Sequence, residues 1–81
     1  MKYTLTLLNP YPCDTHKVEQ ARTLETAKLR AKGLEKPLHT VRMRNGIPFT
    51  PVQFEISKTD TGELVGTFKF GMFYRVKGVK L

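Results

Sequence analysis

The chain has 81 residues, with 14 Lys and Arg against 7 Asp and Glu, a net charge of +7 and one cysteine. This length supports one hydrophobic core, so we expect residues 1–81 to form a single basic domain, and a binding protein is favoured over an enzyme with a deep cleft. A lone Cys13 excludes a disulfide framework, and no apolar stretch is long enough for a membrane span or a signal peptide; we therefore expect a cytoplasmic protein that does not cross a membrane.

The first predicted elements are two short strands. In residues 3–7 apolar and polar side chains alternate, which is the period of a strand with one buried face. A turn containing Pro10 then ends this strand. Residues 16–22 have two interpretations: a strand paired with the first, which we favour because Val18 does not continue the helical stripe that follows, or the start of a longer helix from Thr15.

A helix is predicted over about Thr23–Gly33. Thr23 is a good N-cap and Gly33 a good terminator. Spacings of three, four and three residues place one narrow apolar stripe on this helix, made of Leu24, Ala27, Ala31 and Leu34.

After the helix, residues 40–44 alternate again and predict a strand whose outer face carries Arg42 and Arg44. Asn45 and Gly46 follow at once. Both residues tolerate positive φ, so they predict the tip of a hairpin.

The C-terminal half predicts further strands. Pro48 and Pro51 keep their segment out of a central ladder, at an edge or a bulge. Residues 52–57 alternate, and after a turn the run 64–77 alternates with its apolar residues at even positions. Gly71 is expected to divide this run into two strands.

Together these elements predict an α+β fold. We expect a mostly antiparallel, twisted sheet of four to six strands with one helix packed on one face, in the order β-β-α-β-β-β. The helical stripe is narrow, so the opposite face of the sheet is expected to stay open.

The predicted site is that open face, which would collect five cations, one exposed ring and the hairpin tip. The predicted nucleic-acid-binding residues are Arg42, Arg44, Asn45, Lys69, Phe73, Arg75 and Lys77. Cations displace counterions from phosphates, and a two-stranded ribbon fits a major groove. The scarcity of exposed aromatics disfavours RNA. The sequence therefore predicts an accessory or regulatory module that binds nucleic acid, DNA by preference; an ordinary solvated face is the plainer interpretation.

A second function stays open: a small inhibitor or adaptor, of the kind that mobile elements use, that docks on a larger host protein. Its basic face would meet an acidic protein surface, and residues 45–51 with Leu29 would supply apolar anchors.

Metal, cofactor and catalytic signals are weak. Cys13 and His16 are three residues apart and His39 would be a third ligand, but a structural zinc site needs four. A catalytic cysteine needs a general base, and neither histidine lies at a spacing from Cys13 that is typical of such a pair. We expect no metal, no cofactor and no enzymatic activity.

Overall fold

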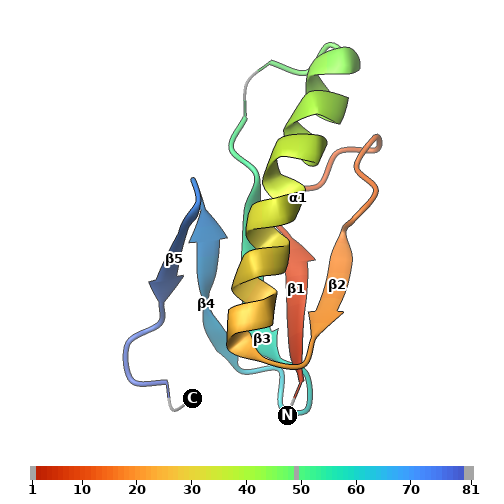
Figure 1. The fold of residues 1–81 in the computed structure, drawn as a ribbon. Coiled ribbons are helices and arrows are strands. Elements are labelled where there is room, and N and C mark those ends of the chain that lie inside the picture. Colours follow the sequence, from red (N-terminus) through yellow and green to blue (C-terminus); the bar gives the residue numbers. More distant parts are fainter. Residues whose placement is uncertain (1, 49, 80–81) are drawn as a thin grey trace.

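The computed structural model describes residues 2–48 and 50–79, and it contains one helix and a five-stranded antiparallel sheet (Figure 1). The elements in chain order are β1 (Tyr3–Leu7), β2 (Val18–Ala21), α1 (Leu24–Arg44), β3 (Gln53–Lys58), β4 (Leu64–Lys69) and β5 (Met72–Arg75). The predicted α+β class and the order β-β-α-β-β-β are confirmed.

The sheet has the spatial order β2-β1-β3-β4-β5. β1 and β2 form a hairpin, so the strand interpretation of residues 16–22 is confirmed and the longer helix from Thr15 is wrong. The chain then crosses one face of the sheet as α1 and returns as β3 on the other side of β1. In this register Leu5 lies opposite Ile56, and both side chains are fully buried.

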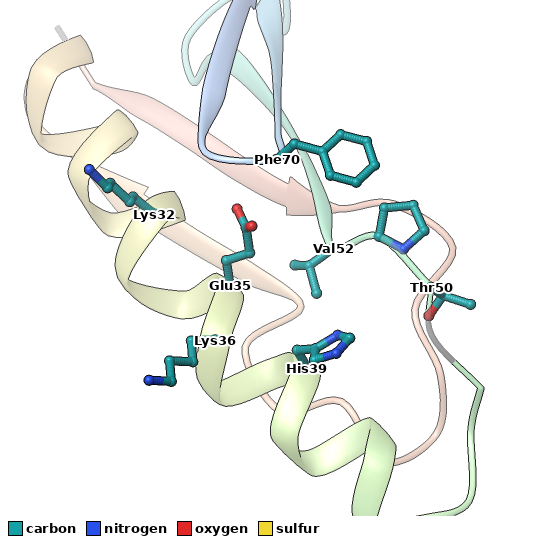
Figure 2. Close-up of a pocket in the computed structure, with 8 residues that line it drawn as sticks. Lys32, Glu35, Lys36, His39, Thr50, Val52 and Phe70 are labelled. Carbon is teal, nitrogen blue, oxygen red and sulfur yellow. The ribbon is translucent and has the colours of Figure 1, made fainter.

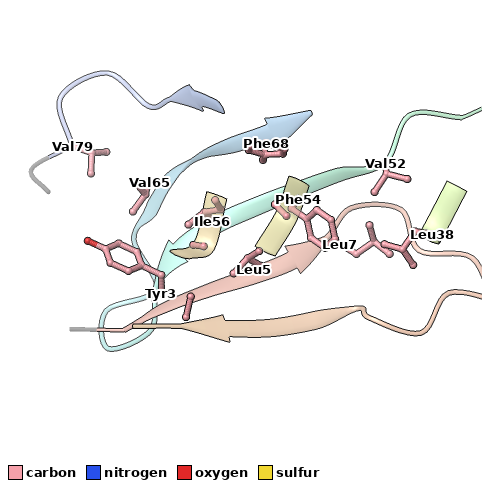
Figure 3. Packing of buried hydrophobic residues seen from close by; sticks show 13 residues of the cluster. Tyr3, Leu5, Leu7, Leu38, Val52, Phe54, Ile56, Val65, Phe68 and Val79 are labelled. Atoms are coloured by element: carbon pink, nitrogen blue, oxygen red, sulfur yellow. The ribbon is translucent and has the colours of Figure 1, made fainter. Parts of the chain in front are cut away.

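The core lies between α1 and the covered face of the sheet, as Figure 3 shows for the strand residues. Ala27 and Ala31 are fully buried on α1, and their small size lets the helix approach the strands closely. The buried apolar residues are Tyr3, Leu5, Leu7, Ala21, Ala27, Ala31, Leu38, Val52, Phe54, Ile56, Val65, Phe68 and Val79.

The N-terminus of α1 begins as predicted, but its predicted end is wrong. Thr23 is the N-cap, and its side chain accepts a hydrogen bond of 3.1 Å from the backbone N–H of Thr26. The helix runs past Gly33 and Pro37 to Arg44. Gly33 and Pro37 are both exposed, so water can donate a hydrogen bond to the carbonyl that Pro37 leaves without a partner. Leu38 continues the buried stripe of the helix.

The predicted strand over residues 40–44 and its hairpin tip are therefore wrong. Asn45 is the C-cap of α1, and Gly46 follows it with φ of +76°. The N–H of Gly46 donates to the carbonyl of Met43 (3.2 Å) and that of Ile47 to the carbonyl of Arg42 (3.0 Å). This pair of bonds is a Schellman motif, which needs positive φ at Gly46 alone, whereas the predicted hairpin turn needs it at both residues.

The β4–β5 turn reverses the predicted sides of the last strand. The turn consists of Phe70 and Gly71, with φ of +52° and +72°. A two-residue turn pairs residues three apart, here Lys69 with Met72, so inward positions change from even to odd numbers. Phe73 consequently packs against the core, and Tyr74 is exposed. The division of the run at Gly71 is confirmed.

α1 is longer than the strands it covers, so the molecule is elongated, with extents of 40 × 19 × 18 Å. Its C-terminal part extends past the sheet, where the β1–β2 loop and the α1–β3 connection lie beside it (Figure 1). Pro48 and Pro51 lie in that connection, outside the strands, as predicted.

Candidate functional site

The predicted nucleic-acid-binding residues do not share one face. Arg42, Arg44 and Asn45 lie at the C-terminal end of α1 and not on a strand. Lys69 faces away from α1, because it alternates with the buried Phe68 in β4. The two arginines and Lys69 therefore lie on different elements, and Lys69 is on the sheet face that points away from α1.

The other three predicted residues are also placed differently from expectation. Phe73 lies on the core side of the sheet. Arg75 pairs with Gly66, which is opposite the buried Ile56, so Arg75 belongs to the helix side, and its guanidinium donates to the carbonyl of Val79. Lys77 is exposed beyond the end of β5. The expectation of one cationic open face is wrong.

The open face is instead neutral for the most part. Among the described strand residues, Lys69 of β4 is the one Lys or Arg on the face that points away from α1. Glu55 of the neighbouring strand β3 lies on the same face and carries the opposite charge. Threonine and glutamine dominate the rest of this face, with Val18, Met72 and Tyr74 as exposed apolar side chains.

Arg42 is held by a buried ion pair that local sequence patterns did not predict. Only 2% of Arg42 is exposed. Its Nε and Nη2 donate to the two carboxylate oxygens of Asp14 at 3.1 and 2.9 Å, and its Nη1 donates to Thr50 Oγ1 at 3.3 Å. The guanidinium carbon also lies 4.8 Å from the ring centroid of Tyr11. Arg42 thus joins the β1–β2 loop and the α1–β3 connection to the helix.

The pKa of Asp14 reflects this setting. Burial raises the pKa of the carboxyl, but the hydrogen bonds from the Arg42 side chain and the Tyr11 backbone, together with the charges of Arg42 and Lys17, outweigh burial. The pKa of Asp14 therefore lies below its ordinary value of 3.8. The sequence offered one signal for the pair: Arg42 falls four residues after the buried Leu38 on the inward stripe.

Three lysines line up along the flank of α1 that faces β4 and β5. Lys28, Lys32 and Lys36 are four residues apart and so form one row, here called the lysine row. Lys28 contacts Glu25 at 3.4 Å and lies 4.7 Å from the ring centroid of Phe73. Lys32 and Lys36 are exposed, and neither forms an ion pair with any residue in 2–48 or 50–79.

A cleft of about 270 Å³ opens beside the lysine row, between α1, the α1–β3 connection and the β4–β5 turn (Figure 2). In Figure 2 the side chains of Glu35 and His39 turn toward this space, whereas the amines of the two lysines project from its rim toward solvent. The residues that line the cleft are Lys32, Glu35, Lys36, His39, Thr50, Pro51, Val52 and Phe70.

Phe70 is the residue of the cleft that sequence reasoning placed on the wrong side. The alternation assigned it to the buried face, yet 59% of it is exposed and it occupies the first position of the turn. The only sequence signal was the Gly71 that follows it. The backbone N–H of Gly71 donates to Glu35 Oε2 at 3.1 Å, which ties this turn to α1.

The cleft combines an apolar wall with cations at its rim, which suits an anionic ligand with a flat apolar part. Within the described residues no group of three or more His, Cys, Asp or Glu could hold a metal ion. No helix in the same part of the chain has the length and apolarity that crossing a membrane requires.

No family model matches the chain, and neither curated proteins nor solved structures match it.

Proposed function

We propose that this protein is a small accessory or regulatory module that binds nucleic acid through the lysine row of α1. The observation that carries the proposal is the placement of Lys32 and Lys36 beside a cleft with an exposed aromatic ring; both lysines are exposed and form no ion pair within residues 2–48 and 50–79. The net charge of +7 supports the same class of partner.

The size of the lysine row suits a phosphate backbone. From Lys28 to Lys36 the helix rises about 12 Å, because each residue adds about 1.5 Å. One strand of a B-form duplex carries a phosphate about every 3.4 Å, so the row spans roughly three or four phosphates. The buried Arg42 is not part of this surface, and its proposed role is to hold α1 in place.

The proposal is tested by neutralising the lysine row. In the variant Lys28→Gln/Lys32→Gln/Lys36→Gln, binding of a labelled oligonucleotide should weaken, and the slope of log affinity against log salt should fall by about 2, since each lost contact to a single strand removes about 0.7. Fluorescence anisotropy over about 50 to 200 mM salt measures both quantities.

A matched control removes the same charge elsewhere. The control replaces three exposed lysines outside α1 by glutamine, namely Lys2, Lys17 and Lys77. In this variant the slope of log affinity against log salt should stay close to that of the unaltered protein. Equal losses in the two triple variants would show that net charge alone governs binding. Failure of the unaltered protein to bind any DNA or RNA at low salt would contradict the proposal.

The second candidate function is docking on a larger protein, and exposed apolar side chains on the open face favour it. Met72 and Tyr74 lie two residues apart on β5, which is an edge strand, and both are at least half exposed. Such an edge can accept another strand. A partner that remains bound after nuclease treatment, and is lost in Met72→Ser/Tyr74→Ser but not in the lysine-row variant, would support this function.

A further inference from the structure

Phe70 combines two unfavourable features at one position. Its φ of +52° lies in the left-handed region, where bulky residues are rare, and 59% of it is exposed. Asn or Gly would fit this turn without strain. Strained residues of this kind gather at ligand sites, where the strain is retained because the side chain is used.

The surroundings hold the Phe70 turn at the mouth of the cleft. The Glu35 carboxylate accepts the N–H of Gly71 at 3.1 Å, and the buried Val52 closes the floor. At about 270 Å³ the cleft lies just below the range of about 300–1,000 Å³ that is typical of small-molecule sites. It therefore suits one flat ring with its polar part left at the rim, and not a large cofactor.

The polar groups around the cleft match the rest of a nucleotide. Lys32 and Lys36 line the cleft on the side of the helix. Their amines point away from the cleft in Figure 2, and rotation of these long side chains would bring them to the phosphates of a strand that follows α1. Glu35 uses Oε2 for Gly71, and within the described residues its Oε1 has no hydrogen bond. A carboxylate oxygen in this position accepts a hydrogen bond from the amino group of a base.

We propose that this cleft binds a single nucleotide, with the base stacked on Phe70, its amino group facing Glu35 and its phosphates against Lys32 and Lys36. The inference rests on the proposed function and makes it more specific, because a base can enter the cleft only from a single strand, a strand end or a free nucleotide.

The test compares strands with and without bases. An oligo(dA) strand should bind more tightly than a strand of equal length that carries abasic sites. Stacking of one base on an aromatic side chain corresponds to about 5- to 150-fold in affinity. Phe70→Asn should lose a factor in this range for oligo(dA) and nothing for the abasic strand, whereas Phe70→Tyr should bind like the unaltered protein.

Phe70→Asn also controls for folding. Asn-Gly is the preferred pair for this type of turn, so its urea midpoint should be equal to or higher than that of the unaltered protein. Lower affinity at undiminished stability would show that the ring contacts the ligand.

The outcomes separate this inference from the proposed function. If the lysine-row variant weakens binding while Phe70→Asn and the abasic strand bind normally, the base site is overturned and the phosphate contacts stand. If no strand binds at all, the proposed function fails. Free AMP distinguishes the two sources of nucleotide: NMR shifts at Gly71 and His39 that Phe70→Asn abolishes, without binding of oligo(dA), would support a free nucleotide as the ligand.

Discussion

Arg42 and Arg44 are two residues apart in the sequence and have opposite surroundings. Arg42 points inward, where Asp14 and Thr50 satisfy its donors and the Tyr11 ring lies against it. Arg44 is exposed on the last turn of α1. A charged residue on the inward stripe of a helix needs such a partner, because an unpaired charge in the interior is strongly unfavourable.

Removing both members of the Asp14–Arg42 pair should cost less stability than the two single removals added together. We expect Asp14→Asn to lower the free energy of unfolding by about 3 kcal/mol, because it leaves the Arg42 charge buried without a counter-charge. The double variant Asp14→Leu/Arg42→Met should lose less than the sum of Asp14→Leu and Arg42→Met. Urea unfolding of the unaltered protein, the two single variants Asp14→Leu and Arg42→Met and the double variant measures this coupling. Additive losses of unfolding free energy would show that the two residues do not act as a pair.

The same pair predicts a dependence of stability on pH. The pKa of Asp14 is lower in the folded chain than its ordinary value of 3.8, so the folded state binds fewer protons than the unfolded chain. The stabilisation from Asp14 is therefore complete above about pH 4 and is lost as the pH falls through the folded pKa. The difference in unfolding free energy between the unaltered protein and Asp14→Asn should stay constant from about pH 7 to 5 and shrink below about pH 4. A constant difference down to about pH 2 would contradict this.

At the scale of the element, α1 shows that an inward stripe can override residues that usually end a helix. Gly33 and Pro37 lie four residues apart, and Pro37 removes the hydrogen bond to the carbonyl of Gly33. Burial continues on the other side of the helix at Ala31 and Leu38. The stabilisation from that burial exceeds the loss of one exposed hydrogen bond.

Two glycines of this segment should respond in opposite directions to the same substitution. Neither Gly33 nor Gly46 has a heavy atom within 4 Å of an added Cβ, but Gly46 has φ of +76°. We expect Gly33→Ala to raise the free energy of unfolding by about 0.5–1 kcal/mol, because alanine favours the helix. Gly46→Ala should lower it by about 1 kcal/mol, because of the left-handed backbone.

Thermal unfolding of both variants measures these effects. A loss in Gly33→Ala would show that α1 is not continuous at this position.

At the scale of the whole molecule, the helix side carries more positive charge than the open face of the sheet. α1 carries Lys or Arg at positions 28, 30, 32, 36, 42 and 44 and acids only at 25 and 35. The open face of the sheet carries Lys69 and Glu55 among threonines and glutamines. A polyanion should therefore approach the side of the molecule that α1 covers.

An NMR titration can test this orientation of the whole domain. With a single-stranded oligonucleotide we expect amide shift changes over residues 28–39 and at the β4–β5 turn, and none at Thr4, Thr6 and Gln20 of the open face. Amide shift changes confined to the open face would show that the oligonucleotide binds the sheet, and they would contradict the helix-side proposal.

The fold followed from local patterns, and the site did not. The alternation of residues 3–7 and of 52–57 was sufficient to predict strands, because a sheet with one buried face requires it. The end of the helix was mispredicted, because Asn45 and Gly46 satisfy a C-cap and a hairpin tip equally well. Local preference cannot distinguish these two structures, because Gly46 supplies the positive φ that each of them needs and Asn45 is common in both.

The sequence by itself determined the order of the elements and the basic charge of the domain, because periodicity and composition are local properties. Only the tertiary structure decided where those charges lie. Arg42 turned inward because Asp14, 28 residues away in the chain, is available to neutralise it. Phe70 stayed exposed because it lies in the two-residue turn between β4 and β5, and that turn also changes which side of the sheet β5 buries. The place of Arg42 depends on a contact between distant segments, and the turn at Phe70 shows in the strand pairing and not in the alternation of the residues.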